Sequence, residues 1–483
     1  MKKALSILEF HEQVTSGNLS ILEHTAKILE EAKKANKEFH HFNLMAEKEA
    51  MQRAEQLEKL LKQKKANGKL FGVPVSVKDC ICVKGMESTA GSAILKGYNP
   101  LFNATVVEKA LQEGAIIIGK TSQDEFGFGT FSNNVGLGFE KPKNPQDAER
   151  SCGGSSGGSA GFTAFTKFTH VSIAESTGGS IACPASFCGA FGFTPTYGRV
   201  SRYGLIDYAN SLDKIGTTSQ SIQDSALLLE AIAGKDGKDS TSLQEKVEDY
   251  SKLLNEKSKN LRIGVVKEFF GKGIDKQVSE KCWNAVKKLE SEGIKYEEVS
   301  LPLNAKYGIA AYYLVAMTEA STNLARYCGL RYGQSLELEG NFDEFFSKTR
   351  TEFFGEEAKR RIILGTFARM SGFRDAYYLR AMKIRTLLIE EFQKAFKKFS
   401  LLANPTMPIV APKFSEIEKL TPLQNYAMDL CTVPANLAGL PHASIPAGKS
   451  EKEKMPIGLM LTAAHLKEKE LLQASQFLEK VMS

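Results

Sequence analysis

The sequence predicts an α/β protein in which a large mixed, mostly parallel β-sheet is flanked by helices, behind a helical N-terminal layer. Two observations predict this fold. The first 65 residues contain no proline, a single glycine and apolar residues at helical spacing. Beyond residue 70, strand-like runs alternate with amphipathic helices. This alternation is typical of parallel strands whose connecting helices pack on the sheet.

The N-terminal layer, residues 1–65, is predicted to be helical. Ser20 is suited to cap a helix over 20–35, because its hydroxyl can accept a hydrogen bond from the first turn. Residues 66–483 are expected to form one core domain behind this layer. A second N-terminal helix is predicted from the apolar residues Ala46, Ala50, Ala54, Leu57 and Leu61, which recur at helical spacing.

The core domain contains two predicted strand–helix–strand units. The first unit, over 71–119, consists of FGVPVSV, TVVEKALQEG and AIIIG. Gly114 is expected in the left-handed cap of its helix, and three consecutive isoleucines suit a strand that is buried on both faces. The second unit, over 262–300, begins with RIGVV and ends with IKYEEVS. Both units favour parallel strands.

Composition and charge exclude several classes of protein. With 42% hydrophobic and 25% charged residues, the chain is neither disordered nor fibrous. A net charge of +7 over 483 residues gives no indication of direct nucleic-acid binding. No apolar run reaches the roughly 20 residues that a membrane helix needs, and Glu9 interrupts the start too early for a signal peptide. We therefore expect a cytoplasmic protein that makes no membrane contact.

The eight cysteines are scattered along the chain, and none forms a CxxC pair. This spacing argues against a structural zinc site and against a redox motif. We expect reduced, partly buried thiols and no bound metal.

Two serine- and glycine-rich clusters, SCGGSSGGSAG at 151–161 and ESTGGSIACPASFCG at 175–189, are the least ordinary part of the sequence. They could be linkers, a phosphate-binding loop or an acyl-transfer site. The apolar segment between them argues against linkers, and no lysine follows either cluster as a phosphate loop requires. GAIIIGKT at 114–121 fits the phosphate-loop pattern, but its isoleucines belong in a strand. An acyl-transfer site, in which exposed backbone N–H groups form an oxyanion hole, is favoured.

A nucleophilic serine needs a base, and none of the seven histidines lies in a recognisable triad motif. GGSSG and GGSAG fit GxSxG, but the polar DAERSC before them is no buried strand. A lysine can act as the base if burial favours its neutral amine. Lys78 ends the strand-like run FGVPVSV and is a candidate. The alternative is a surface lysine at the end of a strand.

Several stretches match the motifs of one known family: FGVPVSVKD at 71–79, GGSSGGSAG at 153–161, TGGSIACPASFCG at 177–189, RDAYYLRAMKIRTLL at 374–388 and NLAGLPHASIPAG at 436–448. On these motifs, which span nearly the whole chain, the sequence resembles the amidase signature family. The resemblance implies the amidase-signature fold. It also implies that the base is Lys78, the bridging cis-serine is Ser155 and the nucleophile is Ser180.

The resemblance further implies how the substrate is held. Arg361 would bind the α-carboxylate of glutamine and Asp429 its α-amine. An arginine suits the first task because its planar guanidinium can hold a carboxylate with two hydrogen bonds. The oxyanion hole would consist of the backbone N–H groups of Thr177, Gly178, Gly179 and Ser180.

The activity implied is that of a glutaminase within a tRNA-dependent amidotransferase. Glutamine would be hydrolysed to glutamate and ammonia, and the ammonia would amidate Glu-tRNA(Gln) or Asp-tRNA(Asn). Two partner subunits are expected, with tRNA bound mainly through a partner. No cofactor is expected in this chain, since ATP and magnesium would bind at the partner subunit. The alternatives are a stand-alone amidase acting on small amides and a catalytically weakened scaffold subunit.

The sequence departs from the family beside the predicted nucleophile. The family pattern GSDTGGSIR reads AESTGGSIA here, so Ser176 stands in place of an aspartate and Ala182 in place of an arginine. Loss of both members of an ion pair leaves no uncompensated buried charge. Glu175 is expected to take over the role of the lost acid.

Overall fold

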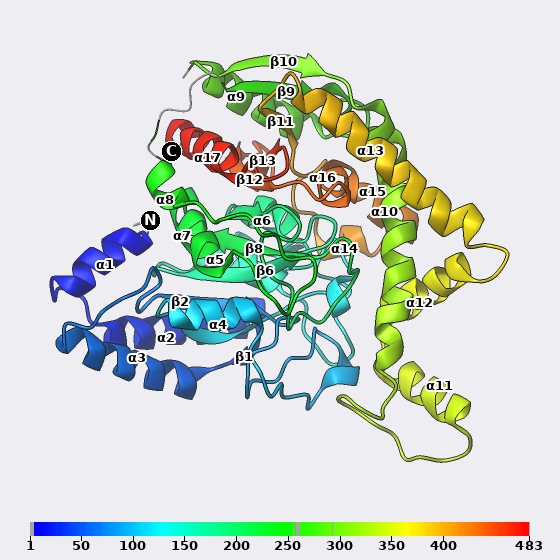
Figure 1. The fold of residues 1–483 in the computed structure, drawn as a ribbon, viewed down its shortest axis with the longest axis horizontal. Helices are drawn as coiled ribbons and strands as arrows, with labels where there is room; N and C mark the ends of the chain where they lie inside the picture. The colour runs from blue at the N-terminus through cyan, green and yellow to red at the C-terminus, as the bar shows by residue number, and fades with distance from the viewer. Residues whose placement is uncertain (1–3, 255, 257–260, 292, 483) are drawn as a thin grey trace.

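The computed structural model describes residues 4–254, 256, 261–291 and 293–482. An 11-stranded sheet runs through it in the order β1-β3-β2-β6-β8-β7-β12-β13-β11-β9-β10 (Figure 1). A separate two-stranded sheet pairs β4 (Lys143–Asn144) with β5 (Asp147–Ser151). The strands of the large sheet are β1 (Phe42–Met45), β2 (Pro74–Lys78), β3 (Ile116–Thr121), β6 (Val171–Ser176), β7 (Phe191–Thr194), β8 (Lys214–Ser219), β9 (Arg262–Val266), β10 (Lys295–Val299), β11 (Leu401–Pro405), β12 (His442–Lys449) and β13 (Pro456–Ala463).

The large sheet is mixed, as predicted, but the expected majority of parallel strands is not observed. The two strand–helix–strand units do form parallel pairs, β2 with β3 and β9 with β10. They lie toward opposite ends of the sheet, and the described strands between β6 and β11 pair antiparallel. One reason is that β12 and β13 are joined by a short connection, which permits only an antiparallel pair.

The N-terminal segment contains helices α1 (Ile7–Thr15), α2 (Ile21–Phe39) and α3 (Glu47–Lys62). The predicted cap of α2 is confirmed, because the Ser20 hydroxyl accepts a hydrogen bond from the Glu23 N–H group at 3.2 Å. Strand β1, between α2 and α3, was not predicted; it pairs antiparallel with β3 and so adds an edge to the sheet. The division into residues 1–65 and 66–483 stays a prediction.

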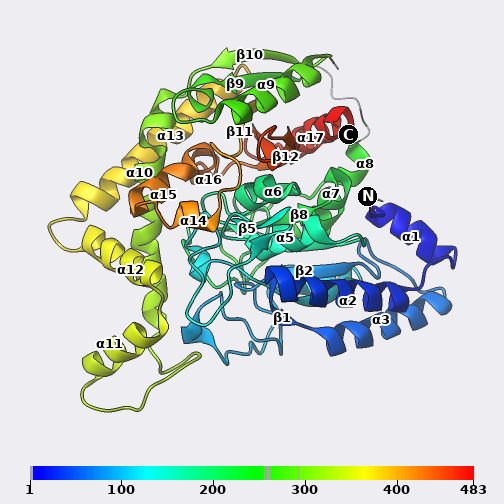
Figure 2. The ribbon, with the colours of Figure 1, turned by 180° about the vertical axis from the view of Figure 1, so that it is seen from behind.

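Helices cover both faces of the sheet. At the end that holds β1, β2 and β3, α4 lies in front of the sheet in Figure 1, whereas α2 and α5 lie in front of it in Figure 2. The N- and C-terminal ends of the chain lie on the same side of the molecule. The helices of these two layers are α4 (Thr105–Gln112), α5 (Gly157–Phe165), α6 (Ala182–Cys188), α7 (Ile222–Ile232), α9 (Lys276–Ser291) and α17 (Glu468–Met482), and the short helix α8 (Tyr250–Leu253) packs on α7 and α17.

A further group of helices stands at one flank of the sheet, on the right in Figure 1. Its longest member, α10, packs against α12, α13 and α16. None of the described helices is both long and apolar enough to cross a membrane. These flanking helices are α10 (Pro302–Asn323), α11 (Phe342–Phe353), α12 (Glu356–Arg369), the π-helix η5 (Asp375–Leu379), α13 (Arg380–Phe396), α14 (Phe414–Ile417), α15 (Pro422–Ala427), the 3₁₀-helix η6 (Met428–Cys431) and α16 (Val433–Leu437).

Candidate active site

The candidate site lies where two neighbouring parallel strands end. Lys78 is the last residue of β2, and Ser176 is the last residue of β6, the strand that pairs with it. The carboxyl ends of parallel strands lie at the same edge of a sheet, where ligands commonly bind in α/β proteins. The turn 177–181 continues from β6 toward α6, and a second turn containing Ser155 leads into α5. The strand order therefore brings the turns of Ser155 and Ser180, which follow Lys78 by about 80 and about 100 residues in the chain, next to Lys78.

Lys78 is completely buried, and its amine is surrounded by oxygen atoms. The Nζ atom donates to Ser155 Oγ at 2.7 Å, to Glu175 Oε2 at 2.8 Å and to the Glu175 carbonyl oxygen at 3.0 Å. The peptide bond between Gly154 and Ser155 is cis, as the family resemblance implied. The alternative of a surface lysine is therefore wrong, because strand β2 is buried along its whole length.

Ser180 is 6% exposed and lines a small pocket next to Ser155. The Ser156 N–H group donates to the Ser180 carbonyl oxygen at 3.1 Å, which joins the two serine-rich turns. Within the described part of the chain, no hydrogen bond connects the Ser155 and Ser180 hydroxyls. The backbone N–H groups of four consecutive residues likewise have no protein acceptor among the described residues: Thr177, Gly178, Gly179 and Ser180. Such free donors can bind a developing oxyanion.

The glycines of both turns are required by close contacts. A Cβ atom at Gly178 would overlap the Tyr312 ring, and one at Gly179 would overlap the Thr432 side chain. A Cβ atom at Gly154 would overlap the carboxylate of Asp124. The clusters are therefore tightly packed backbone rather than linkers, and side chains larger than glycine would displace the turns.

The flanking helices close the pocket from the other side. Arg361, on α12, is 3% exposed. Its Nε atom donates to Glu357 Oε1 at 2.8 Å, and its Nη1 atom donates to the Tyr208 hydroxyl. The pocket is lined by Gly127, Gly129, Gly154, Gly178, Gly179, Ser180, Tyr312, Tyr313, Arg361 and Asp429.

Four aromatic rings surround the Arg361 guanidinium, each with its centroid 5.0 to 5.6 Å away. Aromatic faces stabilise a cation and exclude water from it. This enclosure could not be identified from the sequence, because its members are dispersed along the chain: Phe128, Tyr208, Tyr313 and Tyr426.

Asp429, in η6, is the acidic group of the pocket. Its Oδ1 atom accepts a hydrogen bond from Thr130 at 2.9 Å, and its Oδ2 atom accepts one from the Tyr313 hydroxyl at 2.6 Å. Burial raises the pKa of Asp429 to about 6, although both hydrogen bonds and the charge of Arg361 oppose this shift. The carboxylate is therefore the main form at pH 7. The structure thus brings Arg361 and Asp429 to the pocket that holds Ser180.

Glu175 has a different contact from the expected one. It does not replace the lost aspartate, because its carboxylate forms a buried ion pair with Lys78. The Thr177 hydroxyl lies 2.8 Å from both Glu175 Oε1 and Asp213 Oδ1 and so bridges the two carboxyl groups. Burial, with the negative charge of Glu175 as a second cause, raises the pKa of Asp213 well above its usual range. In the sequence, the only indication of this group of contacts was Glu175 itself, a glutamate that the family pattern does not have at this position.

The positions of the lost ion pair are filled by neutral groups. The Ser176 hydroxyl donates to Asn436 Oδ1 at 3.3 Å. Ala182 packs with Ala435 and Met460 in a small apolar cluster. Neither substitution therefore leaves a charge of the former pair buried without its partner.

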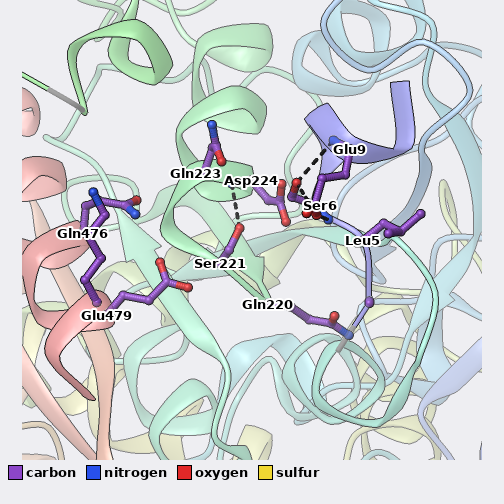
Figure 3. Close-up of a pocket in the computed structure, with 11 residues that line it drawn as sticks. Leu5, Ser6, Glu9, Gln220, Ser221, Gln223, Asp224, Gln476 and Glu479 are labelled. Atoms are coloured by element: carbon purple, nitrogen blue, oxygen red, sulfur yellow. Dashed lines mark hydrogen bonds between the residues drawn. The ribbon is translucent and has the colours of Figure 1, made fainter. Parts of the chain in front are cut away.

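Two other features lie outside this pocket. Lys120, from the stretch that matches the phosphate-loop pattern, is in strand β3, where the isoleucines before it were expected, and forms a buried ion pair with Asp79. A larger cavity, about 530 Å³, lies between α1, α7 and α17 and is lined by Ser6, Asp224 and Glu479, among others (Figure 3). In the part of the chain that the structure describes, no cluster of His, Cys, Asp or Glu side chains could hold a metal ion.

Comparison with known proteins gives consistent results along the whole chain. The Amidase family model matches residues 23–472. The A subunit of the glutamyl-tRNA(Gln) amidotransferase from Methanosarcina mazei is 44% identical over 481 residues, which cover 99% of this chain and 97% of the relative. The protein of the same name from Trichodesmium erythraeum is 43% identical over 98% of this chain and 97% of the relative.

Solved structures agree with these sequence relatives. The crystal structure of the glutamyl-tRNA(Gln) amidotransferase A subunit from Thermotoga maritima is 32% identical, with a TM-score of 0.75 over 96% of this chain and 94% of that one. A crystal structure described as an amidase has a TM-score of 0.82 at 26% identity over 99% of this chain and 100% of that one. On its sequence, its fold and the motifs gathered at its pocket, the chain belongs to the amidase signature family.

Proposed function

We propose that this protein is the glutaminase subunit of a tRNA-dependent amidotransferase and hydrolyses glutamine to glutamate and ammonia. The observation that most supports the proposal is the hydrogen bond between Lys78 and Ser155 beside a pocket that holds Ser180, one cation and one carboxylate. The names of the relatives, which are A subunits of glutamyl-tRNA(Gln) amidotransferases, support the choice of substrate and reaction.

In the proposed reaction, Ser180 is the nucleophile and Lys78 the base. Ser180 Oγ attacks the side-chain amide carbon of glutamine, and its proton passes through Ser155 to the neutral amine of Lys78. The oxyanion is bound by the free N–H groups of residues 177–180. As the carbon–nitrogen bond breaks, the proton returns through Ser155 to the leaving ammonia. Water then hydrolyses the γ-glutamyl ester on Ser180, using the same groups.

The charges of the pocket suit an α-amino acid. Arg361 would hold the α-carboxylate and Asp429 the α-ammonium group, so that the side-chain amide points toward Ser180. The aromatic enclosure of Arg361 keeps water away from this contact, which strengthens it. A neutral amide without both charged groups would gain neither of these contacts, which favours glutamine over simple amides.

The ammonia would be used by partner subunits. We propose two partners, of which one binds ATP and magnesium, holds most of the tRNA and converts Glu-tRNA(Gln) or Asp-tRNA(Asn) to its amidated form. This chain would then need no cofactor of its own. Because aminoacyl-tRNA is consumed at the ribosome, the proposed location is the cytoplasm.

The test is ammonia release from glutamine, measured for this chain alone and after addition of its two partner subunits. We expect turnover that appears or rises sharply with the partners, and none from a Ser180→Ala variant in the same complex. Turnover by Ser180→Ala at the wild-type rate would contradict the assignment of the nucleophile. Equal turnover without partners would favour a stand-alone amidase, and a stable complex without turnover would favour a scaffold.

A further inference from the structure

Glu175 contacts the candidate base through both its side chain and its backbone. Its Oε2 atom and its carbonyl oxygen lie 2.8 Å and 3.0 Å from Lys78 Nζ. The side chains of Lys78 and Glu175 are 0% and 4% exposed, so the ion pair is shielded from water and from salt. The family pattern has a serine at this position, which brings no charge to the lysine.

A carboxylate at this position has two opposing effects on Lys78. It fixes the amine, because Ser155 and the two Glu175 oxygens together occupy three directions around Nζ. It also favours the ammonium form, because a nearby opposite charge stabilises a charged group. A base must be a neutral amine before it can accept a proton from Ser155. The same contact that positions Lys78 therefore limits when it can act.

Other titratable groups surround the pair of Lys78 and Glu175. Asp213 shares the Thr177 hydroxyl with Glu175, and burial raises the pKa of Asp213 well above its usual range. Of these two carboxyl groups, Glu175 is the one that contacts Lys78. Cys80 after β2 and Asp124 after β3 interact electrostatically with Lys78, and Tyr208 before β8 lies beside the Glu175 carboxylate. Beyond these groups, Asp79 and Lys120 act on Cys80, and Arg361 acts on Asp124.

We propose that Glu175 is a positioning residue, whose carboxylate holds Lys78 against Ser155 and sets the pH above which the amine can accept the serine proton. The proposal rests on the proposed function, in which Lys78 is the base. When Ser180 attacks, its proton moves through Ser155 to Lys78, and the ammonium that forms is stabilised by Glu175. When the leaving group departs, it takes this proton by the reverse route, so Glu175 itself gains and loses none.

The test measures the reactivity of Ser180 without glutamine or partners. A fluorophosphonate forms a bond between phosphorus and Ser180 Oγ, releases fluoride and passes the serine proton through Ser155 to Lys78. The labelling rate is measured against pH for the wild type and for Glu175→Gln, which keeps the size and an acceptor oxygen but removes the charge. The site of labelling is verified by mass spectrometry and by its loss in Ser180→Ala.

We expect the acid limb of the Glu175→Gln profile to lie about one to three pH units below that of the wild type. At a pH on the acid limb of the wild type, a displacement of one pH unit makes the labelling rate of Glu175→Gln, expressed relative to its plateau, about tenfold higher than that of the wild type. Glu175→Asp keeps the charge and should keep the limb near its wild-type position. Asp224→Asn, which changes a buried carboxyl at the distant cavity of Figure 3, should leave the profile unchanged.

If the acid limbs of the labelling rate against pH coincide for wild type and Glu175→Gln, the inference is overturned and the proposed function is left intact. A wild type that is not labelled at Ser180 at any pH would overturn both. Asp124, whose pKa burial raises to about 6, titrates in all of these variants, so a difference between them reports Glu175. If Glu175→Gln does not fold, as judged by circular dichroism, Glu175→Ser restores the residue of the family pattern and has the same expected displacement.

Discussion

The two sides of the candidate active site are built in different ways. The sheet side consists of Lys78, Ser155 and Ser180, which lie at the ends of adjacent strands and in turns packed too closely for any Cβ atom at their glycines. The flank side consists of Arg361 and Asp429, which lie on separate helices and are held by side-chain hydrogen bonds. Backbone packing therefore fixes the turns that carry the reacting serines, whereas polar and aromatic side chains fix the groups that would select the substrate.

This difference predicts separate kinetic effects for the two sides. Changes on the sheet side should lower kcat, because they alter groups that act in the transition state. Changes on the flank side should chiefly raise KM for glutamine, because they alter groups that hold the substrate before and during the reaction.

The largest effect is expected for Lys78→Met. Loss of the base should lower kcat for ammonia release by about 10²- to 10⁴-fold. This variant also leaves Glu175 buried without its partner, which destabilises the fold. The matched control is Lys78→Met combined with Glu175→Gln, which should recover thermal stability without recovering activity. A loss of less than tenfold in a folded variant would mean that the base lies elsewhere.

A smaller effect, on KM, is expected for Arg361→Ala. Loss of a charge-assisted hydrogen bond should raise KM for glutamine by about 10- to 100-fold, with a lesser change in kcat. Arg360→Ala is the control, because Arg360 also pairs with Glu357 but is 39% exposed and does not line the pocket. The comparison requires KM and kcat for glutamine of both variants, measured by steady-state kinetics at the same neutral pH. An unchanged KM for Arg361→Ala would show that the carboxylate binds elsewhere.

The flank side should also respond to pH on its own. Because burial raises the pKa of Asp429 to about 6, this carboxyl gains a proton as the pH falls through 6 and loses its attraction for the α-ammonium group. We expect KM for glutamine to rise as the pH is lowered below about 6, and to level off above it. Measurement of KM at pH values that extend about one to two units below and above pH 6 tests this expectation. A KM that stays constant throughout would contradict the contact with Asp429.

The smallest effect is expected for Tyr313→Phe, which removes one hydrogen bond to Asp429. A lost neutral donor of this kind costs about 1 kcal/mol, which is a roughly fivefold increase in KM at pH 7. Because this hydrogen bond lowers the pKa of Asp429, its loss should also move the rise in KM to higher pH. The ring and its packing on Arg361 are kept, so kcat should change little. If KM depends on pH in the variant as it does in the wild type, the Tyr313 hydroxyl does not contribute to substrate binding.

Sequence patterns identified the sheet side of the site more completely than the flank side. The predicted strands and glycine-rich turns are local features, so the two serine-rich clusters and Lys78 could be singled out from the residues themselves, and the resemblance then assigned Ser155 and Ser180 within them. Arg361 and Asp429 were named only through the family resemblance, because an arginine and an aspartate on helices look like ordinary surface residues in a sequence. Their aromatic and hydrogen-bonding partners could not be named at all.

The sequence by itself determined the α/β class, the cap of α2, the two parallel strand–helix–strand units and the motifs of the family. These features depend on residues close together in the chain, where periodicity and turn chemistry are visible. Only the tertiary structure decided the antiparallel centre of the sheet, the addition of β1 and the ion pair between Glu175 and Lys78. Apart from the hairpin of β12 and β13, each of these joins segments far apart in the chain, and such pairing depends on packing that no local pattern records.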